Sequence, residues 1–312
     1  MTPKKRWNRR VGCAHALMHG AFANGMGVLG RIEPRMAAAM HDILARPGSL
    51  VRATTCYLIG IEMGVPEKSA RAMACGIEYL HTASLIFDDL PAMDDARTRR
   101  GAACVHVVHG EAIAMLAGLA LINRAYAMIW QHIRSSNPQR RSAAGEWVDA
   151  RLGIHGMIGG QAFDLQGWRG EQSAAEVSEV AARKTGDLLR LALVLPAIVG
   201  CGSEREIQIL DRLALLRGLA YQAADDLKDV ISANDEFGKT GGRDRDLGRP
   251  NFVIAEGFSA ALRRFRRLSD TGDRVQAALP GPAERWMMLD GLKVPTPVCT
   301  AGADSSWLSA AI

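Results

Sequence analysis

Aromatic side chains are scarce in this sequence. Seven phenylalanines, six tryptophans and four tyrosines make up 5% of its 312 residues. Proteins that bind single-stranded nucleic acid stack the bases on aromatic side chains, so this composition disfavours such a surface. The formal net charge of +5 is modest, and we interpret the arginine-rich run at 263–267 as the solvated face of a helix. The sequence therefore predicts no nucleic-acid partner.

Cysteines at metal-binding or redox spacing are missing. The six cysteines are scattered, and no two of them form a C-x-x-C pair. This pattern predicts reduced, mostly buried thiols and a cytoplasmic location. Long apolar runs are missing too. None approaches the roughly 18 residues that a membrane-spanning helix needs, so we expect no membrane span.

Acidic residues are absent from the first 32 positions, which hold six lysines and arginines. A basic segment without acids is typical of an organellar transit peptide, of a disordered extension, or of a start codon placed too early. His15 and His19 interrupt its only apolar stretch, which disfavours a secretory signal. We favour a disordered basic extension over residues 1–32.

Alternating runs of β-branched residues are also missing, whereas almost every long segment has helical periodicity. We therefore predict an all-α fold, a single-domain helical bundle around a central cavity over residues 33–292, with an irregular tail at 293–312. Segment 111–133 is apolar on nearly all sides, as in a buried central helix. The predicted helices cover 33–45, 50–63, 67–89, 111–133, 144–166, 174–198 and 204–231.

Three signals indicate where these helices begin and break. Ser173, followed by Glu176, forms a capping box. Gly186 marks a kink or a break within 174–198. The polar, glycine-rich segment 232–250 is too long for a simple connector, which indicates a working flap.

A first acidic cluster ends a mostly apolar run, HTASLIFDDLPAMDDARTRRG, at residues 81–101. Carboxylates beside apolar surface are costly unless a cation binds them. Arginines follow at once, and arginine grips phosphate oxygens with two parallel hydrogen bonds. A charged helix end broken by Pro91 is the alternative for this stretch alone. The cluster comprises Asp88, Asp89, Asp94, Asp95, Arg97, Arg99 and Arg100.

A second acidic cluster lies far away in the sequence, in YQAADDLKD at residues 221–229. Asp225 and Asp229 are four residues apart and share one helix face, with Asp226 beside them. Two such clusters on different helices can face each other across a bundle cavity. Oxygen ligands without histidine or thiolate favour magnesium, bound together with substrate phosphate.

The predicted flap adds glycines and cations. Residues 237–250 read FGKTGGRDRDLGRP, and glycines let a backbone close over a ligand. The cations can meet a polyphosphate, although a solvated loop is the alternative. They are Lys239, Arg243, Arg245 and Arg249.

The two acidic segments, with the K-T-G of residues 184–186 between them and the flap after them, resemble the trans-isoprenyl diphosphate synthases. The first motif has the longer D-D-x-x-x-x-D spacing of bacterial geranylgeranyl and farnesyl diphosphate synthases. The resemblance covers residues from about 33 to 284. It implies a homodimeric prenyltransferase that condenses isopentenyl diphosphate with an allylic diphosphate (dimethylallyl, geranyl or farnesyl), assisted by three magnesium ions.

The resemblance also implies roles for individual residues. Magnesium would be held by Asp88, Asp94 and Asp225, with Asp89, Asp226 and Asp229 close by. The allylic diphosphate would be bound by Arg99, Lys184, Lys239 and Arg249. Isopentenyl diphosphate would be bound by Arg52, His81 and Arg100. The allylic cation would be stabilised by the backbone carbonyl of Thr185 and the side chain of Gln222, and a supporting motif is matched by Gln161 and Asp164.

Product length should depend on the residues that precede the first acidic motif. In the family, a bulky aromatic about one turn before the first aspartate halts growth at fifteen carbons. Here that turn carries Ala83 and Ser84, and Leu80 or Ile77 is the next candidate stop. We therefore predict the twenty-carbon product, geranylgeranyl diphosphate, with farnesyl diphosphate as the alternative.

The chain departs from the family in its G-G-K-R-x-R-P motif, which reads PGSLVRA at 47–53. Ser49 replaces the lysine that meets isopentenyl diphosphate, and we expect this to raise KM rather than abolish activity. The loss motivates an alternative, a non-catalytic or modifying subunit of a heteromeric synthase. A terpene cyclase is disfavoured, because the second acidic segment lacks the N-D-x-x-S-x-x-x-E pattern of cyclases.

Overall fold

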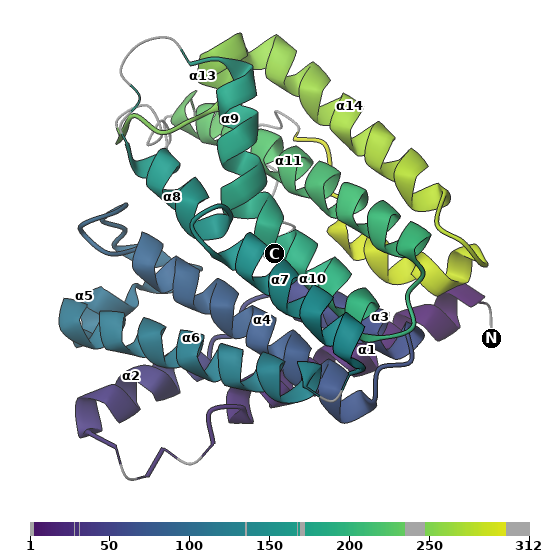
Figure 1. Cartoon of the computed structure of the whole chain (residues 1–312). Coiled ribbons are helices and arrows are strands. Elements are labelled where there is room, and N and C mark those ends of the chain that lie inside the picture. Colours follow the sequence, from purple (N-terminus) through teal and green to yellow (C-terminus); the bar gives the residue numbers. More distant parts are fainter. Residues whose placement is uncertain are drawn as a thin grey trace. The chain divides into compact units, whose positions relative to one another are not determined.

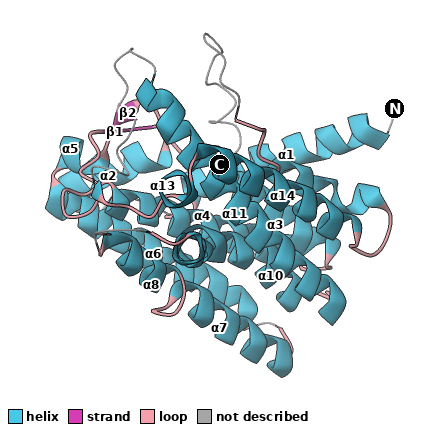
Figure 2. Cartoon of the chain, turned by 90° about the horizontal axis from the view of Figure 1, so that it is seen from above, coloured by secondary structure: helices cyan, strands magenta, loops and turns pink. Residues whose placement is uncertain are grey.

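The computed structural model describes residues 3–27, 29–30, 32–134, 136–166, 168, 172–234 and 247–297. Regular structure in this part is almost entirely helical (Figures 1 and 2), which confirms the predicted all-α fold. The sequence predicts one domain, whereas the contacts divide into two compact units. The first unit runs through residue 144 and includes 196–201. The second holds 145–195 and the described residues between 202 and 297.

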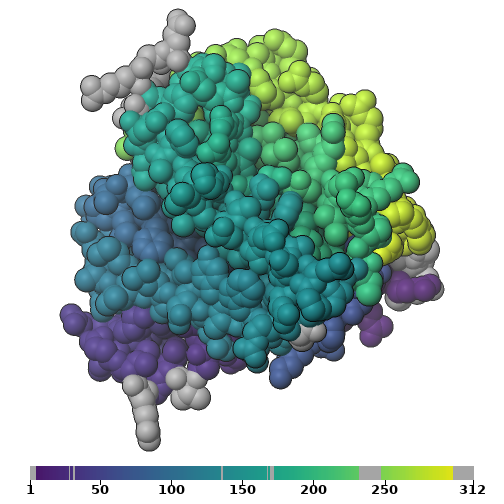
Figure 3. Space-filling model, in the orientation of Figure 1, coloured from purple at the N-terminus to yellow at the C-terminus, as the bar shows by residue number. Residues whose placement is uncertain are grey.

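The first unit begins with four helices, α1 (Pro3–Asn24), α2 (Pro34–Leu44), α3 (Val51–Glu62) and α4 (Glu67–Asp88). A hairpin of β1 (Thr98–Arg99) and β2 (Ala102–Ala103) follows. The unit continues through α5 (Val105–His109), α6 (Glu111–Ile133) and the start of α7 (Pro138–Leu152). Helix α4 packs along α6 and against α3 (Figure 1). In the space-filling view the side chains of α2 lie against those of α5 and α6 (Figure 3).

Helix α4 is the enclosed helix of this unit, where the sequence predicts that role for 111–133. Thirteen of its 22 residues are buried, against eight of the 23 residues in α6. The other face of α6 exposes Met115, Leu116 and Leu119. Composition alone cannot distinguish an apolar face that is buried from one that is exposed, so the apolar sequence of α6 led to the prediction that it is the buried helix.

Helix α6 is also long and apolar enough to pass a test for membrane-spanning helices, and it is the one helix in the described part of the chain that does. This differs from the expectation that no stretch approaches that length. A single such helix is weak support for a membrane span, because partly buried core helices pass the same test.

The N-terminal segment forms α1 rather than the disordered extension predicted for residues 1–32. Its apolar residues Trp7, Met18 and Phe22 are buried. The hydroxyl of Tyr79 on α4 donates to the carbonyl of Phe22 at 2.7 Å, and the two rings meet edge to face at 5.1 Å. The basic residues mask this apolar periodicity when the sequence is read by composition.

The second unit is built around α11 (Glu204–Asn234). Before it come α8 (Met157–Leu165), α9 (Ala174–Ala181), a π-helical turn (Ala182–Gly186) and α10 (Asp187–Val199), whose end belongs to the first unit. After it come α13 (Phe252–Glu256), α14 (Phe258–Ala277) and a 3₁₀ helix (Ala283–Leu292). Alanines on α11 let neighbouring helices approach closely, and the resulting core includes Ala220, Ala223, Ala224, Phe252 and Phe265.

The boundaries of α7, α8 and α9 agree only in part with those predicted. The capping box of Ser173 and Glu176 is present at the start of α9. The helix predicted at 144–166 is two helices, α7 and α8, separated at 153–156. Helix α7 starts at Pro138 rather than at the predicted residue 144, and proline is suited to the first helical position.

The arginine-rich run of α14 is a solvated helix face, as predicted. Arg263, Arg266 and Arg267 are exposed, whereas Phe265 is buried. Arg264 holds the carboxylate of Glu256 with two hydrogen bonds, at 2.6 and 2.8 Å.

Among the cysteines that the structure describes, none forms a disulfide. Cys56, Cys75 and Cys104 are buried, and Cys13 and Cys201 are exposed. Burial raises the pKa of the Cys75 thiol to about 12, which leaves it protonated. The cytoplasmic location stays a prediction.

Candidate functional site

The first acidic segment folds back on the end of α4. The backbone N–H of Asp94 donates to the carbonyl of Asp88 at 2.9 Å, and that of Ala96 donates to the carbonyl of Asp89 at 3.1 Å. Asp95 takes a left-handed conformation in this turn, with φ of 46°. Asp88 and Asp94, both half-buried, are therefore brought next to each other from the two ends of the turn.

Asp89 has a different environment from its neighbours. It is 4% exposed, and one carboxylate oxygen accepts from Nε and Nη2 of Arg99 at 2.9 and 2.6 Å. This pairing fixes the guanidinium of Arg99, one of the predicted phosphate ligands. The metal role predicted for Asp89 stays a prediction.

Two of the three arginines after the acids, Arg99 and Arg100, are presented by the β1–β2 hairpin. Arg100 and Gly101 occupy its two-residue turn with φ of 53° and 75°, as a type I′ turn requires. The guanidinium of Arg100 lies against Gly48, where a Cβ atom would collide with it. Glycine at position 48 therefore lets segment 47–52 and the hairpin meet.

Two residues predicted for isopentenyl diphosphate, Arg52 and His81, are in direct contact. Nη1 of Arg52 lies 3.2 Å from Nε2 of His81. Arginine can only donate, so Nε2 accepts and the neutral ring carries its proton on Nδ1. Burial, together with the positive charges of Arg52, Arg100 and Arg99, holds the pKa of His81 well below 6.5. The ring is thus a neutral donor at physiological pH.

This depressed pKa predicts how stability depends on pH. As the pH falls below 6.5, the unfolded chain takes up a proton at His81 before the folded chain does. The contribution of neutral His81 to the free energy of unfolding is therefore fully present above pH 6.5. It is lost as the pH falls toward the lower pKa that His81 has in the folded protein. In the window just below pH 6.5 it should decline by up to about 1.4 kcal/mol per pH unit.

Chemical denaturation between pH 7 and 5 would measure this effect. The control is His81→Gln, whose stability should change less steeply over the same range. Equal slopes for the two proteins would contradict a neutral, buried His81.

Beneath this pair lies a buried carboxyl group that sequence reasoning missed. Glu78 is 2% exposed, and burial raises its pKa, opposed by the charges of Arg52 and Arg100. Glu78 lies three residues, about one helical turn, before His81 on α4. This spacing places the two side chains on the same helix face and could have identified Glu78 from the sequence.

The residues predicted to set product length lie in the same helix. Ala83 and Leu80 are buried, and Ser84 is half-buried with its hydroxyl donating to the carbonyl of His81 at 2.9 Å. Small side chains therefore occupy the turn of α4 that precedes Asp88.

The second acidic segment lies on α11 in the second unit. Asp225 is exposed and Asp229 half-buried, on one helix face. Asp226 is 1% exposed, and its two oxygens accept from Nε2 of Gln222 at 2.8 Å and from the N–H of Phe252 at 2.7 Å. Asp226 thus fastens Gln222 and the start of α13, and a direct metal role for it stays a prediction.

The π-helical turn presents Lys184 and Thr185 beside this segment. Nζ of Lys184 donates to Oδ2 of Asp164 at 2.5 Å. The hydroxyl of Thr185 donates to Oε1 of Gln222 at 3.1 Å. Single-turn π segments inside α-helices are frequent at functional sites. Because Asp226 only accepts, the amide nitrogen of Gln222 faces Asp226 and its oxygen faces Thr185.

Of the four cations in the predicted flap, the structure describes Arg249. It contacts Asp164, the residue that also binds Lys184. Its Nη1 donates to the backbone carbonyl of Asp164 at 3.1 Å. Gln172 accepts from the N–H of Asn251 and donates to the carbonyl of Arg249, both at 3.0 Å. Sequence reasoning missed Gln172 and Asn251. The signal for Asn251 was its place as the N-cap of α13. Outside the described residues lie Lys239, Arg243 and Arg245.

Within the described ranges, no three His, Cys, Asp or Glu side chains form a group that could hold a metal ion. Each acidic segment instead supplies a pair of carboxylates, Asp88 with Asp94 and Asp225 with Asp229. A cavity of about 500 Å³ on α14, lined by arginines and aspartates, involves none of these residues.

Comparison with known proteins adds to these observations. A family model described as polyprenyl synthetase matches residues 33–274. The chain is 40% identical over 210 residues to geranylgeranyl pyrophosphate synthase 7, chloroplastic, of Arabidopsis thaliana, and the match covers 66% of this chain and 60% of that protein. It is 33% identical over 243 residues to heterodimeric geranylgeranyl pyrophosphate synthase large subunit 2 of Arabidopsis thaliana, covering 76% of this chain and 64% of that protein. The chain spans less than two thirds of the length of these two relatives.

A solved structure with a similar fold is the geranyltransferase from Helicobacter pylori complexed with magnesium and isoprenyl diphosphate. The TM-score is 0.78 at 23% identity, and the match covers 94% of this chain and 96% of that one. At this identity the likeness shows the fold alone.

Proposed function

The chain belongs to the polyprenyl synthetase family, and on this premise we propose that it is a prenyltransferase that condenses isopentenyl diphosphate with an allylic diphosphate. The twenty-carbon product, geranylgeranyl diphosphate, is the main product we propose. The names of its relatives and the small side chains at Ala83 and Ser84 support this length.

The observation that carries the proposal is the linked group on the π-helical turn and α11. Lys184 and Thr185 stand side by side, Thr185 bonds to Gln222, and Gln222 bonds to the acidic segment through Asp226. A diphosphate-binding cation, a carbonyl for an allylic cation and a pair of carboxylates are thus held together.

Magnesium fits the acids that the structure presents. It commonly takes one or two carboxylates, together with water and substrate phosphate oxygens. The pairs Asp88 with Asp94 and Asp225 with Asp229 are donor sets of that kind, and the Helicobacter pylori protein was solved with magnesium. When bound, magnesium would neutralise charge that develops on a leaving diphosphate. The number of ions, three by resemblance, is part of the proposal.

In the first step the C–O bond of the allylic diphosphate breaks. Lys184, Arg249 and Arg99 would bind the departing diphosphate. Lys184 is ion-paired with Asp164, and because its ammonium group has three N–H donors it could keep this contact while it binds a diphosphate oxygen. The carbonyl of Thr185 and the amide oxygen of Gln222 would face the cation, and Asp226 fixes that orientation.

In the second step the double bond of isopentenyl diphosphate supplies the electron pair of the new C–C bond. Arg52, His81 and Arg100 would hold its diphosphate, with His81 donating from Nδ1. The proton lost from the adduct would pass to the departing diphosphate, so the reaction needs no side-chain base.

Incubation of the purified protein with magnesium, farnesyl diphosphate and isopentenyl diphosphate tests the proposal. The expected product is geranylgeranyl diphosphate, identified by mass spectrometry. A second candidate function is a subunit that acts with a partner synthase. The loss of the lysine at Ser49 favours it, as does the heterodimeric relative. Product formed only with a partner synthase would support the subunit and contradict the first proposal.

A homodimer is supported by the apolar surface that α5 and α6 expose. Val108, Leu116 and Leu119 are each more than half exposed on these two neighbouring helices. Contiguous apolar surface of this kind marks interaction sites. A mass of one chain in light scattering would refute the dimer.

Restoring the family lysine should improve binding of isopentenyl diphosphate. The hydroxyl of Ser49 is buried and has no hydrogen-bond partner within the described chain, so nothing there depends on it. Ser49→Lys is expected to lower the KM for isopentenyl diphosphate by up to about tenfold, the value of one charge-assisted contact. The KM for the allylic substrate should not change.

Steady-state kinetics of Ser49→Lys beside Ser49→Met would separate charge from length. An equal KM in the two variants would mean that Arg52, His81 and Arg100 suffice without a third cation.

A further inference from the structure

The π-helical turn that carries Lys184 and Thr185 needs support from outside itself. The π-helix is rare and occurs mostly as single turns inside longer α-helices. Here the turn joins α9 to α10 over Ala182–Gly186. Its shape decides where Lys184 and Thr185 point.

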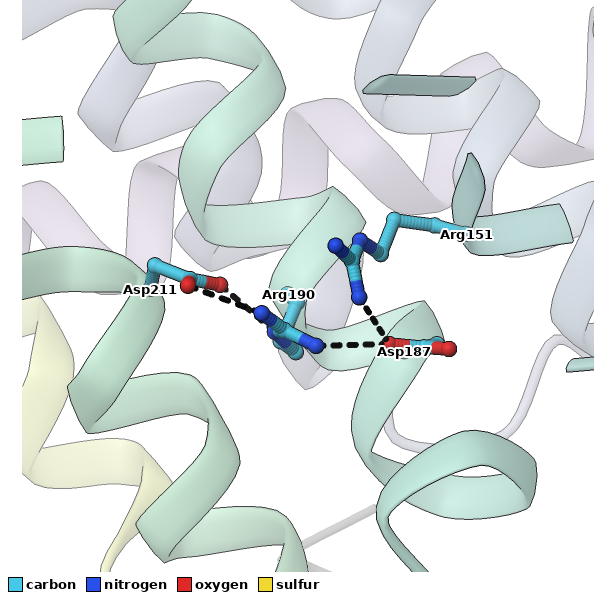
Figure 4. A network of polar contacts seen from close by, with 4 residues as sticks. All are labelled: Arg151, Asp187, Arg190 and Asp211. Atoms are coloured by element: carbon cyan, nitrogen blue, oxygen red, sulfur yellow. Dashed lines mark hydrogen bonds and ion pairs between the residues drawn. The ribbon is translucent and has the colours of Figure 1, made fainter. Parts of the chain in front are cut away.

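The residue directly after the turn contacts α7 and is linked to α11 through Arg190. The side chain of Asp187 is 3% exposed, and one of its oxygens accepts from Nη1 of Arg151 on α7 at 2.9 Å and from Nη1 of Arg190 at 3.1 Å (Figure 4). Arg190 also grips both oxygens of Asp211 on α11, at 2.5 and 2.8 Å. Two aspartates and two arginines therefore form a charge-balanced network.

Two further contacts make this network rigid. The guanidinium carbons of Arg151 and Arg190 lie 4.6 and 5.7 Å from the ring centre of Trp147, so both arginines contact one indole. At the turn itself, a Cβ atom on Gly218 of α11 would lie 2.9 Å from the Cα atom of Gly186. The turn is thus pressed against α11 at Gly186 and anchored one residue later at Asp187.

We propose that Asp187 is a positioning residue, which acts through Arg151 and Arg190 to hold the π-helical turn in the shape that presents Lys184 and Thr185. It contacts no substrate itself. This inference rests on the proposed function, in which Lys184 binds the allylic diphosphate and Thr185 faces the allylic cation.

Asp187→Asn keeps the volume of the side chain and removes the charge that Arg151 and Arg190 share. The KM for the allylic diphosphate should rise about tenfold and kcat should fall by a similar factor, because displacement of positioned groups by about 1 Å can cost up to a hundredfold. The KM for isopentenyl diphosphate should stay within about twofold, since its ligands lie elsewhere in the chain. Titration with a non-reactive allylic diphosphate analogue should show the same loss of affinity without turnover.

Glu206→Gln is the matched control. Glu206 is also buried in the second unit and forms an ion pair with Arg285 at 2.7 Å, away from the turn. It should lower Tm without changing either KM. Arg151→Gln removes one of the two arginines that bind Asp187. It should raise the KM for the allylic diphosphate and lower kcat, each by less than Asp187→Asn does, and it replaces that variant if Asp187→Asn does not fold.

The outcomes separate this inference from the proposed function. A wild-type protein without prenyl transfer would refute the proposed function. An active wild type whose Asp187→Asn and Arg151→Gln variants lose Tm, as Glu206→Gln does, but bind the allylic analogue normally would refute the positioning role.

Discussion

Replacing Ala83 with tyrosine is expected to shift the main product from twenty carbons to fifteen. Ala83 is fully buried in α4, five residues before Asp88, where the sequence places the floor of the growing chain. A phenol ring there would occupy the space that the fourth isoprene unit needs. Product analysis by chromatography and mass spectrometry would record the change.

The same substitution should also cost stability. Overpacking a filled core position typically costs about 1–3 kcal/mol, so Tm should fall while the protein remains folded. Leu80→Ala is the reciprocal control, because it deepens the floor by about one turn and should give products longer than twenty carbons. A folded, active Ala83→Tyr variant that still makes the twenty-carbon product would show that Ala83 does not face the growing chain.

Two of the long helices, α4 and α6, could be predicted because their signals are local. Helices α4 and α6 begin and end within a residue of the predicted bounds, since apolar periodicity and terminal residues decide them. The position of Asp88 at the end of α4 follows from the same signals. Arg52 and His81, both assigned to isopentenyl diphosphate by resemblance, are in contact although they lie 29 positions apart in the sequence.

The features that could not be predicted depend on contacts between distant segments. Gly186 indicates a break, yet a π turn forms because Gly218 approaches it and Asp187 is anchored to α7. Helical spacing places Asp226 beside Asp225, but its burial depends on Phe252, which lies 26 positions later. Local pattern cannot supply such information.

This difference between Asp225 and Asp226 sharpens the prediction for the acidic segments. Asp88→Asn and Asp225→Asn should each lower kcat by roughly a thousandfold, the equivalent of about 4 kcal/mol of lost charge stabilisation. Asp226→Asn should lower kcat less, and it should lower Tm because the N–H of Phe252 and the amide of Gln222 would lose a charged partner. Single-turnover rates and thermal unfolding would separate the two kinds of effect. A wild-type rate in Asp88→Asn or Asp225→Asn would contradict the metal role.

Combining Asp88→Asn with Asp225→Asn tests whether the two acidic segments act on the same diphosphate. If they act as one catalytic group, the double variant should be little slower than either single variant, because residues that work as a unit are strongly non-additive. If they act independently, the two effects should multiply to roughly a millionfold. We expect the first result. Loss of the carboxylate of one segment would already displace the metal-bound diphosphate from the cations that bind it, so loss of the other carboxylate would add little.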